Sequence, residues 1–197
     1  SIGDVTHRIQ ASELQDKGVL ANCHVNVLQT QDHPMFKTYA EELKWLTTDK
    51  VRMAWVAKTI KDVSTSGNTL VLVDRISAGE ILQEQLEGSV FVSGSTKNVD
   101  RKEQYDEVST ATNKIIIATY GVASVGINIP RIFNLVLIEP GKSFVRVIQS
   151  IGRGIRKAED KENVQIWDIT SSCKFAKRHL GARKKFYKEA NYPYNIE

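Results

Sequence analysis

The chain has 197 residues, 41% of them hydrophobic and 25% charged, a composition typical of one globular domain with an extension or at most two small domains. It carries 27 Lys and Arg against 23 Asp and Glu, so the net charge of +4 is only mildly basic. No apolar run approaches the ~18–20 residues that cross a bilayer, and the first residues resemble neither a signal peptide nor a natural start. We therefore expect a soluble piece of a longer protein.

Cysteine usage gives no sign of a disulfide or a metal site. Cys23 and Cys173 lie far apart, without a Cys-x-x-Cys pair, and only four histidines are scattered along the chain. This pattern indicates neither a disulfide framework nor a zinc site, and a reducing cytoplasm is the expected compartment.

The N-terminal third lacks the regular strand–helix alternation of the rest of the chain. Residues 25–28 read as one short strand, and segments 34–43 and 53–60 carry apolar residues at helical spacing. We interpret residues 1–66 as a connector and helical packing layer and not as an independent domain.

Short apolar strands alternate with helical patterns over residues 67–172. The segment Ser77 to Glu80 has the spacing of a capping box, which predicts that a helix follows it, and a further helix is expected over 100–109. Five β-rich runs are predicted to form strands, at 69–73, 90–92, 114–118, 135–138 and 164–167. Such alternation with apolar strands predicts an α/β fold, with a mostly parallel sheet and helices on both faces.

Ligands of open parallel sheets gather at the carboxyl ends of the strands. The segments that follow the five predicted strands are 74–75, 93–96, 119–128, 139–143 and 168–171. We expect the chemistry of the protein in these loops.

Residues 143–157 read as an amphipathic helix with Ser143 as its N-cap. Gln149, Arg153 and Arg156 share one side of it. The opposite stripe is apolar and consists of Phe144, Val147, Ile148, Ile151 and Ile155. From spacing alone, a solvated arginine face explains the pattern as well as a phosphate-binding face does.

A basic segment follows, and residues 173–197 are interpreted as a basic C-terminal helix and tail of the same domain. Residues 174–188 contain seven Lys and Arg and no acid. Lys184 and Lys185 lie on the basic stripe of this helix, which is either a solvated face or the footprint of a phosphate backbone.

In order along the chain, four segments resemble the motifs of a known family. Residues 70–75 are similar to motif IV of the superfamily 2 helicases, and residues 92–96, with Arg101, look like the segment that comes next in that family. Residues 117–130 resemble motif V, and residues 149–156, Gln-x-x-x-Arg-x-x-Arg, resemble motif VI. The resemblance covers about 68–169 and implies the second RecA-like domain of such a helicase. Its flanking segments favour enzymes that remodel branched DNA.

The resemblance implies an ATP site shared with another domain. Arg153 and Arg156 would be arginine fingers that approach the γ-phosphate, with Gln149 beside them, and Gly126 and Asn128 would lie on the nucleotide side of the cleft. Guanidinium groups suit this role because they stay charged and offer a planar fork of donors to phosphate oxygens. The family usually has aspartate where Asn128 stands, which leaves the contact made there open.

The resemblance also implies a groove for a nucleic-acid strand. Its residues would be Arg75, Ser93, Gly94, Thr119, Tyr120 and Lys142, with Lys184 and Lys185 on the basic helix. Such donors hold sugar and phosphate without reading sequence. The spacing between Thr119 and Gly126 leaves open which of Thr119 and Tyr120 makes the backbone contact. Without the resemblance, a plain turn at 93–95 and a strand-end cap at Thr119 remain adequate readings.

Two parts of an ATPase are missing from the sequence. Residues 141–143, Gly-Lys-Ser, do not complete a Walker A loop, because Val136 stands where the first glycine is required. No Asp-Glu pair follows a strand to hold Mg²⁺. We therefore expect this chain to be inactive as an ATPase alone, with ATP and Mg²⁺ bound mainly by an absent N-terminal RecA-like domain.

Three functions are open at this point. The first is one half of an ATP-dependent DNA helicase, acting on single-stranded or branched DNA in the host cytoplasm if phage-encoded, with no membrane partner. The second is a nucleic-acid-binding module without motor function that uses the basic helix. The third is an unrelated α/β enzyme for a small phosphate ester, for which the sequence offers no catalytic set.

Overall fold

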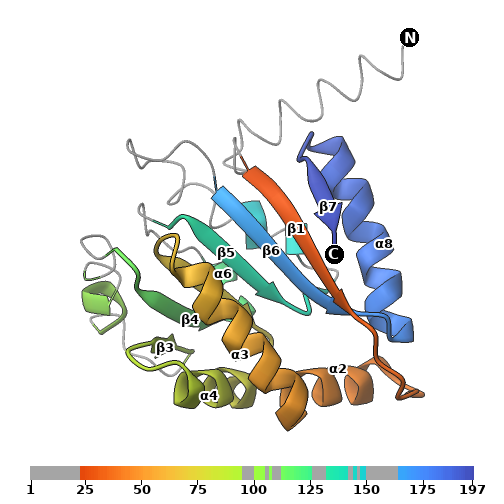
Figure 1. Cartoon of the computed structure of the whole chain (residues 1–197), viewed down its shortest axis with the longest axis horizontal. Helices are drawn as coiled ribbons and strands as arrows, with labels where there is room; N and C mark the ends of the chain where they lie inside the picture. Colours follow the sequence, from red (N-terminus) through yellow and green to blue (C-terminus); the bar gives the residue numbers. More distant parts are fainter. Residues whose placement is uncertain are drawn as a thin grey trace.

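The computed structural model describes residues 23–94, 100–104, 107, 112–125, 132–141, 144–145, 147–149 and 164–197. Its strands form one sheet in the order β3-β4-β2-β5-β6-β1-β7, in which every neighbouring pair is parallel (Figure 1). The strands are β1 (Cys23–Thr30), β2 (Thr69–Val73), β3 (Val90–Val92), β4 (Ile115–Thr119), β5 (Asn134–Ile138), β6 (Val164–Ser171) and β7 (Tyr194–Ile196). The predicted α/β fold with a parallel sheet is confirmed.

Five helices have complete boundaries: α2 (Tyr39–Thr48), α3 (Lys50–Ser64), α4 (Ile76–Gln85), α6 (Tyr120–Ser124) and α8 (Lys174–Glu189). Residues 100–104 and 144–145 are also helical. The side chain of Thr38 accepts from the amide of Glu41 to begin α2, and that of Asp49 accepts from the amide of Arg52 to begin α3. Both satisfy amides that the first helical turn leaves without a partner.

The alternation of side chains along each strand builds two apolar layers. In β2, Leu70 and Leu72 pack into one layer, and Val71 and Val73 pack into the other. Helices α3 and α4 cover the Val71 side, whereas α8 and the side chains of Phe144, Val147 and Ile148 cover the Leu70 side. Because both faces are covered, the interior strands β2 and β5 are mainly apolar, as the sequence predicted, and only their first residues, Thr69 and Asn134, are polar.

Two local predictions were wrong. Helix α4 begins at Ile76, with Arg75 as its N-cap and no capping hydrogen bond from a side chain, so the capping box predicted at residues 77–80 lies inside the helix. Asp168 was expected in a loop after its strand, but β6 continues to Ser171 and Asp168 is fully buried within it. The register with β5 and β1 extends β6 by four residues past the predicted end.

The N-terminal third contributes directly to the sheet. β1 pairs with β6 along its whole length and with β7 on its other side. β7 itself was not predicted, because three residues after a proline carry no strand signal of their own. Helix α2 lies at the edge of the sheet where the strands end and contacts α3, α4 and α8 (Figure 1).

Candidate functional site

The parallel register places the ends of four strands next to one another. Val73 pairs with Thr119, and Leu72 lies between Ala118 and Leu137, so β4, β2 and β5 end at the same level. Val92 pairs with Ala118, which places Ser93 beside the end of β4. The described parts of the loops predicted to hold the chemistry therefore converge on the carboxyl edge of the sheet, with the exception of the buried Asp168.

Thr119 and Tyr120 stand where β4 turns into α6. The Thr119 hydroxyl oxygen accepts from the amide of Val122 at 3.3 Å and caps this short helix. Tyr120 donates its hydroxyl to the carbonyl of Ile138 at 2.9 Å, and burial raises its pKa well above the usual value. The neutral phenol therefore links the end of β4 to the end of β5 through its hydrogen bond. Thr119 is the better placed of the two to contact a ligand.

The turn after β3 is held by an arginine from the next helical segment. Nη2 of Arg101 donates to the carbonyl of Ser93 at 2.9 Å and to that of Gly94 at 3.2 Å. Ser93 is buried, whereas Gly94 is exposed. The bond closes the turn and leaves the Gly94 backbone on the surface beside the end of β4.

Arg75 follows β2, and one of its guanidinium donors is used in a hydrogen bond within the chain. Its Nε donates to Oδ2 of Asp74 at 3.0 Å, with about a third of the Arg75 side chain exposed. The other carboxylate oxygen of Asp74 has no hydrogen-bond partner among the residues that the structure describes. Arg75 keeps further donors for a ligand, whereas the second oxygen of Asp74 is buried.

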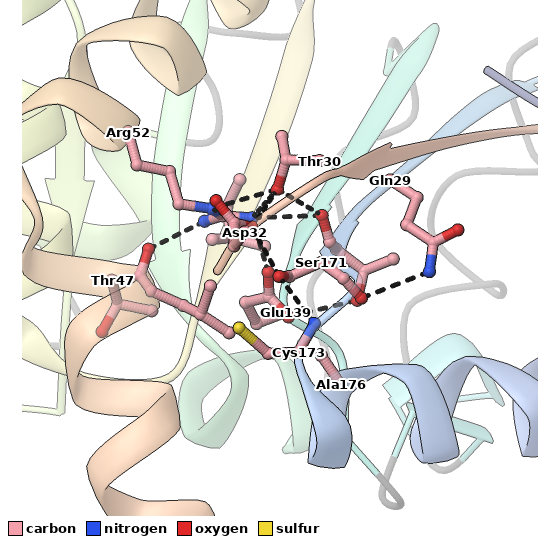
Figure 2. A network of polar contacts seen from close by, with 12 residues as sticks. Gln29, Thr30, Asp32, Thr47, Arg52, Glu139, Ser171, Cys173 and Ala176 are labelled. Atoms are coloured by element: carbon pink, nitrogen blue, oxygen red, sulfur yellow. Dashed lines mark hydrogen bonds and ion pairs between the residues drawn. The ribbon is translucent and has the colours of Figure 1, made fainter. Parts of the chain in front are cut away.

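A buried ion pair fixes the end of β5 (Figure 2). Nη2 of Arg52, on α3, donates to Oε1 of Glu139 at 2.7 Å, and the Thr170 hydroxyl donates to Oε2 at 3.2 Å. Arg52 also donates to the carbonyls of Leu46 and Thr170. Glu139 has a positive φ of 46°, a conformation that costs a non-glycine residue about 1–3 kcal/mol and that persists only where surrounding contacts determine it.

Burial dominates the protonation of Glu139. Loss of water raises the pKa of this carboxyl from 4.5 to about 7, although Arg52 acts in the opposite direction. The group is thus balanced between two charge states near neutral pH.

The same network reaches the segment after β1 (Figure 2). Oδ2 of Asp32 accepts from the hydroxyls of Thr30 at 2.6 Å and Ser171 at 2.5 Å, and Nε of Arg52 lies 3.8 Å from it. The ends of β1, β5 and β6 and the start of α3 are thereby joined. These groups are satisfied by one another, so the network positions the edge and offers no open ligand site.

A second buried ion pair ties α8 to the sheet. Arg183 donates to both carboxylate oxygens of Asp168, at 2.8 and 2.9 Å, and Tyr187 donates to the same carboxylate at 2.6 Å. Burial alone would lower the pKa of Arg183, but Asp168 raises it above its usual value, so the guanidinium stays charged. Arg183 also donates to the carbonyl of Pro140. Residues 139 and 140 are therefore held from both faces of the sheet.

An open cavity of about 570 Å³ lies at this edge. Its floor comes from strand ends and the residues after them, namely Asp74, Tyr120, Glu139 and Gly141. Its walls come from two helices and consist of Tyr39 of α2 and Phe175, Arg178 and His179 of α8. Sequence reasoning missed these wall residues because α2 meets α8 only in the folded chain. The one available signal was Phe175, which interrupts the basic segment.

The predicted basic residues on α8 do not all belong to this edge. Lys184 is half-buried and Lys185 is exposed, but both follow Lys174 by ten residues or more, which is about 15 Å along a helix. Helix α8 begins at the carboxyl edge and runs back along the sheet toward β7 (Figure 1). The structure therefore places Lys184 and Lys185 away from the carboxyl edge, whereas Arg178, near the start of α8, lines the cavity at that edge together with Tyr120.

Of the predicted arginine-bearing helix, the structure describes only the beginning, residues 144–145 and 147–149. Phe144, Val147 and Ile148 are buried in the core, in agreement with the predicted apolar stripe, and Gln149 is half-buried. Phe144 packs edge-to-face on Phe186 of α8 at 5.1 Å. The other predicted contacts to ATP and to the strand lie outside the described residues, namely Gly126, Asn128, Lys142, Arg153 and Arg156.

Comparison with known proteins identifies the family. A model of the helicase conserved C-terminal domain matches residues 51–158, more than half of the chain. The chain belongs to this family. The predicted resemblance to the C-terminal domain of superfamily 2 helicases is confirmed.

Individual relatives agree with this assignment. The chain is 28% identical over 201 residues to the ATP-dependent DNA helicase uvsW of Enterobacteria phage T4, covering 96% of this chain and 40% of that protein. It is 33% identical over 104 residues to Putative helicase 22 of Sulfolobus islandicus filamentous virus, covering 51% of this chain and 18% of that protein. The chain thus spans well under half the length of either relative.

Solved structures show the same fold. The crystal structure of T4 UvsW superposes with a TM-score of 0.78 at 23% identity, over 90% of this chain and 42% of that one. The C-terminal domain of the DEAD-box protein Dbp5 gives a TM-score of 0.60 at 18% identity, over 89% of this chain and 91% of that one. None of the helices that the structure describes is long and apolar enough to cross a membrane.

Proposed function

We propose that this chain is the second motor domain of an ATP-dependent DNA helicase that remodels branched DNA. The family match across residues 51–158, which include all four motif segments, carries the proposal. Arg153 and Arg156 would contact the phosphates of ATP. ATP and Mg²⁺ would be bound mainly by an N-terminal RecA-like domain, and residues 1–66 would serve as interdomain connector and helical packing layer. Relatives more than twice as long as this chain leave room for that domain.

The described part of the edge supports a role in gripping a strand. The Thr119 hydroxyl accepts from its own helix, which leaves its hydrogen to donate to a phosphate oxygen. Arg75 and the exposed backbone of Gly94 stand beside it on neighbouring strands. Contacts of this kind bind the backbone of any sequence, which suits an enzyme that moves along DNA.

The carboxylates described at this edge are engaged with neighbouring side chains. Glu139 is committed to Arg52 and Thr170, and one oxygen of Asp74 is committed to Arg75. No group of three metal-binding side chains occurs among the residues described. That the chain alone does not hydrolyse ATP stays a prediction from the sequence, which lacks a Walker A loop.

Turnover in the natural polypeptide that carries this sequence tests the proposal. Arg153→Ala and Arg156→Ala should each lower the DNA-stimulated ATPase by about 10³-fold or more, because arginine fingers contribute on this scale. Lys58→Ala, at an exposed position on α3, is the matched loss of one positive charge and should leave turnover unchanged. Normal turnover in both arginine variants would refute the motor role.

A second function is favoured by the exposed basic residues of α8. A non-motor nucleic-acid-binding module would lose salt-sensitive DNA affinity when Lys184 and Lys185 are both changed to Glu, and it would be indifferent to Arg153. The motor proposal requires the arginine dependence of turnover, whatever the two lysines contribute to binding.

A further inference from the structure

The cavity at the carboxyl edge has an aromatic wall that the proposed grip on the backbone does not use. The Tyr39 ring packs edge-to-face on His179, with centroids 4.7 Å apart at 85°. Tyr39 also packs on Phe175, with centroids 6.2 Å apart. Phe175 and Tyr39 are both half-buried, so each keeps part of its ring open to the cavity.

Helix α8 is held in place for this wall by a carboxylate from α2. The two oxygens of Glu42 accept from the amides of Phe175 at 3.0 Å and Ala176 at 2.8 Å. Glu42 is buried and satisfies amides that the first turn of α8 would otherwise leave without a partner. The start of α8 is therefore not available to bind a phosphate, and the wall has fixed geometry.

The charges around the cavity select its occupant. Each of the two acidic residues that line the cavity is paired with an arginine of the same chain: Glu139 with Arg52, and Asp74 with Arg75. Lys174, Lys177 and Arg178 are exposed at the start of α8, and the cations of Lys174 and Arg178 lie 5.4 and 5.5 Å from the Phe175 ring. A cationic side chain of a partner would meet positive charge at this entrance. A polyanion that carries flat apolar groups would instead place its negative charge beside the cations at the cavity entrance, and its flat groups against the aromatic rings that line the cavity.

We infer that this cavity receives one nucleobase of the bound DNA strand, packed against Tyr39 and Phe175, with the adjoining phosphate near Arg178. The volume of about 570 Å³ is within the range of small-molecule sites and is ample for a single base. The inference rests on the proposed function, because a strand must first lie along the carboxyl edge.

Removing the bases from the strand tests the inference. Affinity of the chain is measured at low salt for a single strand and for a strand of equal length whose sites are abasic. Stacking of one base on aromatic side chains contributes roughly 5- to 150-fold in affinity, so the intact strand should bind more tightly by such a factor. Phe175→Leu and Tyr39→Leu keep apolar bulk and should lower this ratio toward one, without changing affinity for the abasic strand.

Phe36→Leu is the matched control. Phe36 is half-buried like Phe175 but packs on Trp45 outside the cavity, so its variant should keep the wild-type ratio. A strand carrying 2-aminopurine gives a direct readout, because its fluorescence should be quenched on binding and recover in Phe175→Leu.

Three results would overturn the inference in distinguishable ways. Equal wild-type affinity for intact and abasic strands would show that no base is bound while leaving the backbone grip intact. Equal loss for both strands in Phe175→Leu and Tyr39→Leu would show that the aromatic wall acts on the backbone or on the fold. Absence of binding to either strand would overturn the proposed DNA contact together with the base site.

Discussion

Replacing Glu139 by Gln should change how the stability of the protein depends on pH. The pKa of this carboxyl is raised from 4.5 in the unfolded chain to about 7 in the folded protein. Between these values the folded state keeps a proton that the unfolded state releases, so the contribution of Glu139 to stability is complete below about pH 4.5 and is lost as pH rises through about 7. At about 1.4 kcal/mol for each pKa unit, the whole loss is about 3 kcal/mol.

Glu139→Gln removes this titration and keeps an oxygen that can accept from Arg52. The free energy of unfolding is measured by urea titration for both proteins between about pH 5 and about pH 8. The difference between wild type and variant should change by about 2–3 kcal/mol across this window, in the direction that makes wild type relatively less stable at high pH. The remaining titratable groups are the same in both proteins, so the difference isolates this carboxyl.

A parallel pH dependence of the two proteins would refute the reasoning. It would mean that Arg52, which donates to Glu139 at 2.7 Å, offsets the loss of water completely and keeps the carboxylate ionised. The absolute offset between the two proteins is a separate quantity, because the variant also leaves Arg52 without a full counter-charge.

Further predictions concern the contacts that hold the edge, each measured as the free energy of unfolding in urea. Arg183→Met should cost about 3–5 kcal/mol, because it leaves the fully buried Asp168 without a cation, and a loss below about 1 kcal/mol would contradict the buried pair. Glu42→Gln should cost about 1–2 kcal/mol, because an amide offers one acceptor to the two backbone amides that Glu42 now binds, and Glu41→Gln on the same helix is the control. Thr119→Val should cost about 1 kcal/mol through loss of the α6 cap, whereas Thr119→Ser should retain most of it.

The sequence predicted the sheet because strand signals are local. Runs 70–73 and 135–138 are apolar without interruption, and in the structure they lie in β2 and β5, two adjacent interior strands of the sheet. The apolar stripe at Phe144 and Val147 was equally visible, since helical spacing alone defines it. The order of the strands and the level at which they end could not be read from any residue. They are seen only in the parallel register of the folded chain.

The polar core of the edge could not be predicted in the same way. Arg52 looked like one residue of an amphipathic helix, and Glu139 and Asp168 looked like loop residues that await a ligand. Each acquires its partner from another element of the fold: Arg52 and Glu139 are 87 residues apart, and Asp168 and Arg183 are 15 apart. Nothing in a local pattern distinguishes a buried, paired charge from a functional one, because the difference lies in the surroundings after folding.

The position of β1 in the sheet constrains how the chain folds during synthesis. Among the described strands β1 is synthesised first, yet its neighbours β6 and β7 come from the last part of the chain. Cys23, for example, pairs with Val164. Until those neighbours have been made, both hydrogen-bonding edges of β1 are bare and its valines, Val25 and Val27, have no core to enter. The nascent chain thus carries an unpaired strand until residues 164–171 have been made, and during that time chaperone binding or misassembly competes with correct folding.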